Sequence, residues 1–126
     1  MKSIFSALFA GLLCLSGCGS PAADAGYQSI SQEEAKNMMD NQTVIILDVR
    51  EASEYNSGHI PNAILLPVGS ITADTAAEVI PELDSTVLVY CRSGNRSKKA
   101  SAALAKLGYT NVLEFGGINT WEYEVE

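Results

Sequence analysis

Apolar positions along the chain occur in two patterns: short continuous runs, and segments that repeat with the period of a helix. The continuous runs are typical of strands buried on both faces of a sheet, and they lie at residues 43–47, 63–66, 86–90 and 111–115. Helical patterns lie between them, at residues 31–41, 51–57, 71–80 and 95–107. Ser31 followed by Glu34 predicts a capping box for the first helix, and Gly58 and Gly108 predict the ends of the second and fourth.

This alternation predicts an α/β fold with a mostly parallel central sheet of about five short strands and helices on both faces. Ligands of such sheets bind beyond the carboxyl ends of the strands. Cys91 follows the end of one predicted strand, and Asp48 and Arg50 follow the end of another, so we expect these side chains to share a site. Gly116-Gly117 predicts a turn into a C-terminal helix that contains Trp121, a core residue.

Residues 87–97 (VLVYCRSGNRS) combine a buried strand, a cysteine, a polar loop and the start of a helix. This order holds the Cys91 sulfur against loop N–H groups and a helix N-terminus, between Arg92 and Arg96. Each of these features favours an anion, including the thiolate. The sequence therefore indicates a reactive cysteine that faces an anionic substrate. The alternative is an inert packing cysteine, which more often has apolar neighbours.

Length and composition limit the classes of function. The 126 residues suffice for one domain, and 47% hydrophobic with 18% charged residues indicate a packed core. A net charge of −7 argues against a nucleic-acid partner. Half of the eight Lys and Arg residues nevertheless lie in one short stretch, namely Arg92, Arg96, Lys98 and Lys99. This placement favours local binding of an anion beside Cys91.

Residues 1–17 have the pattern of a secretory signal, with Lys2 before an apolar stretch at 4–15. Leu15-Ser16-Gly17-Cys18 is similar to the bacterial lipoprotein signal, so we expect lipidation at Cys18 and a flexible tether over 18–27. The protein would then be exported and membrane-anchored, on the periplasmic side or at the cell surface. An ordinary cleaved signal is the alternative. Since Cys14 leaves with the signal, Cys91 would be the only free thiol.

The domain that follows, residues 28–126, resembles a single-domain rhodanese, a sulfurtransferase family. The matching segments, in the order of the family, are Leu47-Asp48-Val49-Arg50-Glu51 with Glu54-Tyr55, Gly58-His59-Ile60-Pro61-Asn62-Ala63, Val89-Tyr90-Cys91-Arg92-Ser93-Gly94-Asn95-Arg96-Ser97, and Gly116-Gly117-Ile118 with Trp121. Asn62 replaces the glycine that the family usually has, and we expect it to keep the turn because asparagine tolerates left-handed backbone. The second departure is the short stretch after Trp121, which predicts a shortened last helix.

The resemblance implies an enzyme of the thiosulfate sulfurtransferase type that carries sulfur as a persulfide on Cys91. The donor would be a small anion such as thiosulfate, and the acceptor cyanide or a low-molecular-weight or protein thiol. The covalent persulfide replaces a cofactor, and one cysteine with one histidine does not suggest a metal site. The expected substrate-binding residues are those of the loop: Arg92, Ser93, Gly94, Asn95 and Arg96.

Four further residues are expected to support the site. We expect Asp48 to brace the loop, Arg50 to form an ion pair with Glu54, and His59 to be a hydrogen-bonded turn residue. Ser97 completes the loop motif, and Arg96 has two interpretations, as a ligand of the anion or of loop carbonyls.

Two other classes of function remain open. The first is a noncatalytic module that carries or senses sulfur. The second is a cysteine-dependent phosphatase or arsenate reductase. Four residues separate Cys91 from Arg96, a shorter loop than phosphatases use for phosphate, so the phosphatase class is the less favoured.

Overall fold

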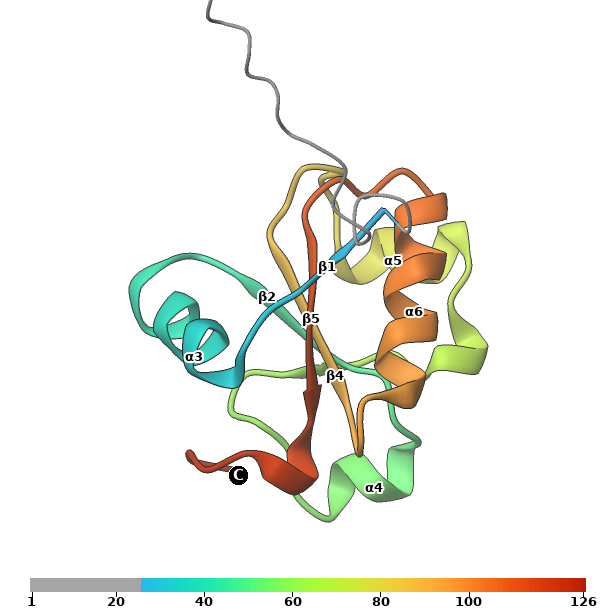
Figure 1. Cartoon of the computed structure of the whole chain (residues 1–126). Coiled ribbons are helices and arrows are strands. Elements are labelled where there is room, and N and C mark those ends of the chain that lie inside the picture. Colours follow the sequence, from blue (N-terminus) through green and yellow to red (C-terminus); the bar gives the residue numbers. More distant parts are fainter. Residues whose placement is uncertain (1–25) are drawn as a thin grey trace, which may run out of the picture.

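The computed structural model describes residues 26–126, whose core is a five-stranded sheet with helices on both faces (Figure 1). The proposed signal at 1–17, Cys18 and most of the tether lie outside the described residues. The elements in chain order are β1 (Gln28–Ser29), α3 (Gln32–Asn41), β2 (Ile45–Asp48), α4 (Ala52–Asn56), β3 (Ile64–Leu65), the 3-10 turn η3 (Val68–Ser70), α5 (Ala73–Val79), β4 (Val87–Cys91), α6 (Asn95–Lys106), β5 (Val112–Gly117) and the 3-10 turn η4 (Ile118–Thr120).

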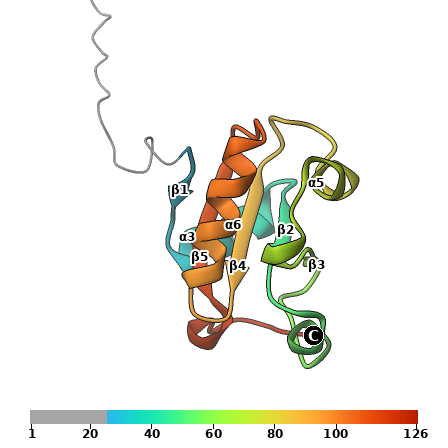
Figure 2. The ribbon, with the colours of Figure 1, turned by 90° about the vertical axis from the view of Figure 1, so that its right-hand side faces the viewer.

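The strands are all parallel and follow the order β1-β5-β4-β2-β3. Figure 2 shows this order across the sheet, with α6 in front and α3 behind. The expected α/β fold is therefore confirmed. Since all strands run the same way, their carboxyl ends meet at one edge of the sheet, and α4 lies beyond that edge (Figure 1). Glu54 of α4 pairs there with Arg96 of α6.

Alternate residues of β4 enter two separate apolar cores. Val87, Val89 and Cys91 pack in the core that α5 and α6 cover, which includes Ala76, Ile80, Ala100 and Leu104. Leu88 and Tyr90 pack in the core beneath α3, which includes Ala35, Ile46, Leu113 and Phe115. This division follows from the pleat, which points successive side chains to opposite faces. Cys91 therefore ends the central strand on the α6 side of the sheet.

Local signals explain where the helices begin and end. Ser31 Oγ accepts the Glu34 N–H at 3.0 Å and caps α3. Gly94 precedes α6 at φ +105°, a backbone conformation that favours glycine. Asn62 keeps its turn with φ +71°, as expected for a residue that tolerates left-handed backbone. The cap at Ser31 and the turn at Asn62 were predicted from neighbouring residues, and the structure confirms both. Of the predicted capping box, only the bond to Ser31 Oγ is found among residues 26–126.

Two parts of the fold differ from the sequence prediction. The edge strand β1 was not predicted, because its two residues are exposed and have no apolar pattern. The C-terminal helix was predicted wrongly: β5 continues to Gly117, and a single 3-10 turn precedes Trp121. The chain then stays extended, since Glu126 exchanges backbone hydrogen bonds with His59 at 2.8 and 2.9 Å. Trp121 still packs against Phe115, with ring centroids 5.6 Å apart.

Among residues 26–126, no helix combines the length and the apolar character that crossing a membrane requires.

Candidate active site

Cys91 is the buried last residue of β4, and the loop after it leads directly into α6. The Gly94 N–H donates to Cys91 Sγ at 3.0 Å. Burial of the thiol raises its pKa, but the hydroxyl of Ser97 and the N–H groups of Ser97, Gly94 and Ser93 lower it further than burial raises it. The pKa of Cys91 therefore lies below its ordinary value. The loop favours the thiolate, which is the nucleophilic form of cysteine.

The backbone of the loop lies tightly against the end of β5. A side chain at Gly117 would place its first carbon 2.0 Å from the carbonyl oxygen of Arg92, so only glycine fits there. The Asn119 N–H donates to the same oxygen at 3.1 Å. The register of β4 and β5 also shifts between Val89 and Cys91, which pairs Cys91 with Gly117. Gly117 thus lets the first turn of the loop pack against the end of β5.

The predicted loop residues divide into a buried and an exposed set. Gly94 and Ser97 are buried beneath the loop, whereas Arg92, Ser93 and Asn95 are exposed. No ion pair of Arg92 is found among residues 26–126, so its guanidinium is available to an incoming anion. The loop therefore offers backbone donors around the sulfur and a cation at its rim.

Arg96 is paired with a carboxylate of the protein itself rather than with the loop carbonyls. Its guanidinium forms two parallel hydrogen bonds to the Glu54 carboxylate, at 2.9 and 3.0 Å, and joins α6 to α4. The bonds from Arg96, with a further one from the Glu51 N–H, lower the pKa of Glu54 to about 2. Neither of the two interpretations of Arg96 anticipated this bidentate pair.

Arg50 pairs with Asp48, so the expected ion pair between Arg50 and Glu54 is wrong. Arg50 Nη2 lies 2.6 Å from Asp48 Oδ2 and also donates to the Gly58 carbonyl at 2.8 Å. The hydrogen bond to Asp48 raises the pKa of Arg50. Tyr90 donates its hydroxyl to the same carboxylate at 2.7 Å. Together with Arg50, Asp48 therefore connects β2, β4 and the segment at Gly58. Within the part of the chain that the structure describes, no hydrogen bond joins Asp48 directly to the backbone of the Cys91 loop.

His59 is a hydrogen-bonded turn residue, as expected. Its ring stacks on Tyr55 with centroids 3.8 Å apart, and Nδ1 lies 3.0 Å from the Tyr55 carbonyl oxygen. Nε2 lies 3.5 Å from a carboxylate oxygen of Glu126. Both ring nitrogens thus face partners that position the turn and the C-terminal segment.

Glu114 is a residue of this site that the sequence analysis missed. It lies on β5 with 3% of its surface exposed, and its carboxylate accepts the Ser97 hydroxyl at 2.7 Å. A glutamate inside the otherwise apolar run Val112-Leu113-Glu114-Phe115 was the available signal, because a buried charge requires specific partners. Sequence spacing alone did not reveal that its partner is Ser97.

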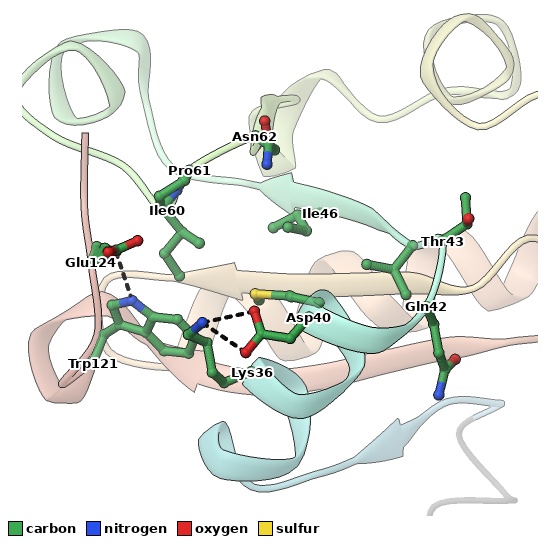
Figure 3. A pocket seen from close by; sticks show the side chains of 12 residues that line it. Lys36, Asp40, Gln42, Thr43, Ile46, Ile60, Pro61, Asn62, Trp121 and Glu124 are labelled. Carbon is green, nitrogen blue, oxygen red and sulfur yellow. Dashed lines mark hydrogen bonds and ion pairs between the residues drawn. The ribbon is translucent and has the colours of Figure 1, made fainter.

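A hollow of about 380 Å³ lies away from the Cys91 loop, on the α3 face of the sheet (Figure 3). Two pairs of its polar lining groups are engaged with each other: Lys36 pairs with Asp40 at 2.8 Å, and the Trp121 ring N–H donates to the Glu124 carbonyl at 3.0 Å. No lining residue belongs to the Cys91 loop. The hollow is therefore separate from the thiol site.

The fold and the cysteine loop match a known family. Residues 31–124 match the model of the rhodanese-like domain. The chain therefore belongs to the rhodanese-like family, in agreement with the resemblance seen in the sequence.

Three similar proteins illustrate the match. A protein named sulfurtransferase from Allochromatium vinosum is 38% identical over 92 residues, which are 72% of this chain and 83% of that protein. The thiosulfate sulfurtransferase PspE of Escherichia coli is 35% identical over 57% of this chain and 68% of its own length. The structure described as rhodanese with anions from E. coli has a TM-score of 0.62 at 30% identity, covering 67% of this chain and 98% of that one. Some other relatives are much longer, and the chain spans 26–29% of their length.

Proposed function

We propose that the protein is a sulfurtransferase that moves sulfane sulfur from an anionic donor to a thiophilic acceptor through a persulfide on Cys91. One observation carries the proposal: the Cys91 sulfur lies in a loop whose N–H groups point at it, with Gly94 N at 3.0 Å. The donors that lower the thiol pKa can also donate hydrogen bonds to the negatively charged terminal sulfur of a persulfide. The names of the relatives, which include a thiosulfate sulfurtransferase, support the reaction class and the donor.

The first half-reaction loads the cysteine. The Cys91 thiolate attacks the outer sulfur of a donor such as thiosulfate, and a sulfur–sulfur bond forms. The bond between the two donor sulfurs breaks, and sulfite leaves with that electron pair. Because Cys91 is buried, the donor approaches through the mouth of the loop, past the exposed Arg92, Ser93 and Asn95.

The second half-reaction unloads the cysteine. A nucleophile, cyanide or a small or protein thiolate, attacks the terminal persulfide sulfur. The bond between that sulfur and Cys91 breaks, and its electron pair returns to Cys91 as thiolate. The products are thiocyanate or the acceptor persulfide, and the two separate steps predict ping-pong kinetics.

Mass spectrometry of the intact protein tests the loading step. Incubation with thiosulfate is expected to add about 32 Da, the mass of one sulfur atom, and cyanide is expected to remove it. Cys91→Ser is the matched control and is expected to gain nothing. Absence of the adduct in folded wild-type protein, or its persistence in Cys91→Ser, contradicts the proposal.

The same experiment separates the other classes. An adduct that forms but is not passed to cyanide or to small thiols identifies a carrier or sensing module. Hydrolysis of an aryl phosphate that depends on Cys91, without sulfur loading, identifies a phosphatase.

We further propose that the protein is a bacterial lipoprotein, exported and anchored to a membrane through lipid on Cys18. The support is the sequence Leu15-Ser16-Gly17-Cys18 after the apolar stretch. In cells fed labelled fatty acid, the wild type is expected to carry the label and Cys18→Ser is not. An unlabelled product cleaved elsewhere contradicts the anchor.

A further inference from the structure

Glu114 is surrounded by hydrogen-bond donors at the base of the Cys91 loop. Oε1 accepts the Ser29 hydroxyl at 3.1 Å, and Oε2 accepts both the Ser97 hydroxyl at 2.7 Å and the Gly116 N–H at 2.8 Å. These are the partners that an ionised carboxylate requires, because it can only accept hydrogen bonds. The side chain is 3% exposed, so a negative charge is held inside the molecule beside the reactive loop.

The Ser97 hydroxyl donates to Glu114 at 2.7 Å, with the Gly116 carbonyl oxygen at 3.4 Å, and the same hydroxyl lowers the pKa of Cys91. Ser97 is buried, and its hydroxyl also stabilises the Cys91 thiolate as a donor. A hydroxyl carries one proton. When that proton points to Glu114 it cannot point to Cys91, and hydrogen bonds to charged acceptors are about twice as strong as bonds to neutral ones.

We propose that Glu114 is a positioning residue for Cys91, which holds the Ser97 hydroxyl proton away from the sulfur until the sulfur becomes negative. With Cys91 protonated, the Ser97 proton stays on Glu114, and the Ser97 oxygen is free to accept the thiol proton. When the sulfur is a thiolate or persulfide, the hydroxyl turns to it, and Glu114 keeps the bonds from Ser29 and Gly116. The carboxylate thus competes with the sulfur for one proton.

The neighbouring elements place other polar groups around this site. Arg96 of α6 is the cation whose charge acts on Cys91, and its guanidinium is held by Glu54 of α4. The partner of Glu114 on β1 is the neutral Ser29, and Gln32 of α3 donates to the Phe115 and Gly117 carbonyls. Glu114 is thus the carboxylate in direct contact with the hydroxyl that also reaches the sulfur.

Glu114→Gln is the informative variant because the amide fits the same contacts. Its oxygen can replace Oε2 and accept the bonds from Ser97 and Gly116, while its NH₂ group donates to Ser29. The geometry is kept and only the charge is lost. Ser29→Ala is the matched control, since it removes a bond to the same carboxylate without touching Ser97.

The pKa of Cys91 is the readout, taken from the pH dependence of alkylation of the Cys91 peptide by mass spectrometry. This readout excludes Cys14 and Cys18 of the full chain. We expect Glu114→Gln to lower the Cys91 pKa by about half a unit or more, and Ser97→Ala to raise it. In the Ser97→Ala background, Glu114→Gln should have less than half of its original effect. Ser29→Ala should leave the pKa near the wild-type value.

Three results would overturn the proposal: an unchanged or raised pKa in Glu114→Gln, the same shift in Ser29→Ala, or an undiminished shift without the Ser97 hydroxyl. If Glu114→Gln does not fold, Glu114→Asp replaces it, because the shorter carboxylate draws back from Ser97 and should also lower the pKa. The inference rests on the proposed function only in taking Cys91 as the reactive thiol. Alkylation needs no sulfur donor, so this test can fail while persulfide formation succeeds, and the reverse.

Discussion

At Cys91, burial and hydrogen bonding act on the thiol in opposite directions. Burial disfavours the charged sulfur, whereas one hydroxyl and three backbone N–H groups favour it, and the donors prevail. The sequence predicted the N–H donors correctly, but it also predicted that Arg92 and Arg96 would act on the thiol. In the structure the Arg96 guanidinium pairs with Glu54 while its charge still acts on Cys91, and Arg92 is exposed at the rim. The Cys91 thiolate is therefore stabilised mainly by the hydroxyl and the backbone N–H groups of the loop.

The lowered pKa of Cys91 predicts the pH dependence of persulfide formation. The thiolate reacts, so the rate is highest above the Cys91 pKa and falls as the pH drops through it. The midpoint is expected below the ordinary thiol value of about 8.5. Single-turnover loading with thiosulfate over a pH series measures it. A midpoint at or above the ordinary value would contradict the lowered pKa.

Gly117 predicts a second effect at the residue scale. Gly117→Ala places a methyl group 2.0 Å from the Arg92 carbonyl oxygen, so the loop must move. We expect a loss of about 2 kcal/mol or more in the free energy of unfolding, together with a large loss of persulfide formation. Urea unfolding and thiosulfate loading measure the two effects.

Gly69→Ala is the matched control for this substitution, since nothing lies within 4 Å of its added carbon. Its expected change is within about 0.5 kcal/mol. Equal behaviour of the two variants would show that the close approach at Gly117 does not constrain the loop.

Among the elements, the contact between α4 and the start of α6 is the one that the sequence did not reveal. Helix α4 has five residues and none of them is fully buried, although Tyr55 packs against the core beneath α3. Its attachment includes the bidentate pair of Glu54 with Arg96, and Arg50 holds the Gly58 carbonyl just after its end. This short helix is thereby held beside the Cys91 loop by polar contacts together with the packing of Tyr55.

Glu54→Gln tests this link between the elements. With a folded pKa of about 2 against an ordinary 4.5, Glu54 stabilises the fold fully above pH 4.5. That contribution is lost as the pH falls from about 4.5 toward 2. Because both side chains are a quarter to a third exposed, we expect the variant to lose only about 1 kcal/mol at pH 7.

Urea unfolding at several pH values checks this expectation, and the difference from wild type should shrink in acid. Glu78→Gln, an exposed carboxylate on α5, is the control and should show no such difference. A pH-independent loss in Glu54→Gln would refute the charge pairing.

At the scale of the whole molecule, the parallel sheet brings distant segments to one edge. Asp48 and Tyr90 are neighbours in the register of β2 and β4, although 42 positions separate them in the chain. The Tyr90 hydroxyl also accepts the Ile60 N–H at 3.0 Å. Tyr90 therefore connects β4, β2 and the segment before β3, on the face opposite to Cys91.

Tyr90→Phe is expected to destabilise the fold without abolishing sulfur loading. It leaves the Ile60 N–H and one bond of Asp48 without their partner, which costs about 1–3 kcal/mol for buried groups. Cys91 faces the other core, so persulfide formation in the folded variant should persist. Thermal unfolding and intact-protein mass spectrometry measure the two effects.

The control for Tyr90→Phe is Tyr123→Phe. Tyr123 is 39% exposed, so the unfolding of this variant should barely change. Loss of loading in folded Tyr90→Phe would show that the two cores are coupled at the site.

The fold class, the principal strands and the position of Cys91 were predictable because they depend on local signals. Apolar runs, capping residues such as Ser31 and the turn residue Asn62 act over a few positions, and the structure follows them. The edge strand β1 and the extended C-terminal segment were not predictable in this way. Both are held by backbone pairing with distant partners, β5 and His59.

The polar partners of the site were decided only by the tertiary structure. A sequence lists the charged groups but not the distances between them, and charge pairing depends on those distances. In the folded chain Arg50 pairs with Asp48, Arg96 pairs with Glu54, and the Glu114 carboxylate accepts the Ser97 hydroxyl. The sequence alone was enough to place Cys91 at the end of a buried strand in a rhodanese-like chain, since that motif is contiguous. The contact between Glu114 and Ser97 joins β5 to α6, and only folding brings those two elements together.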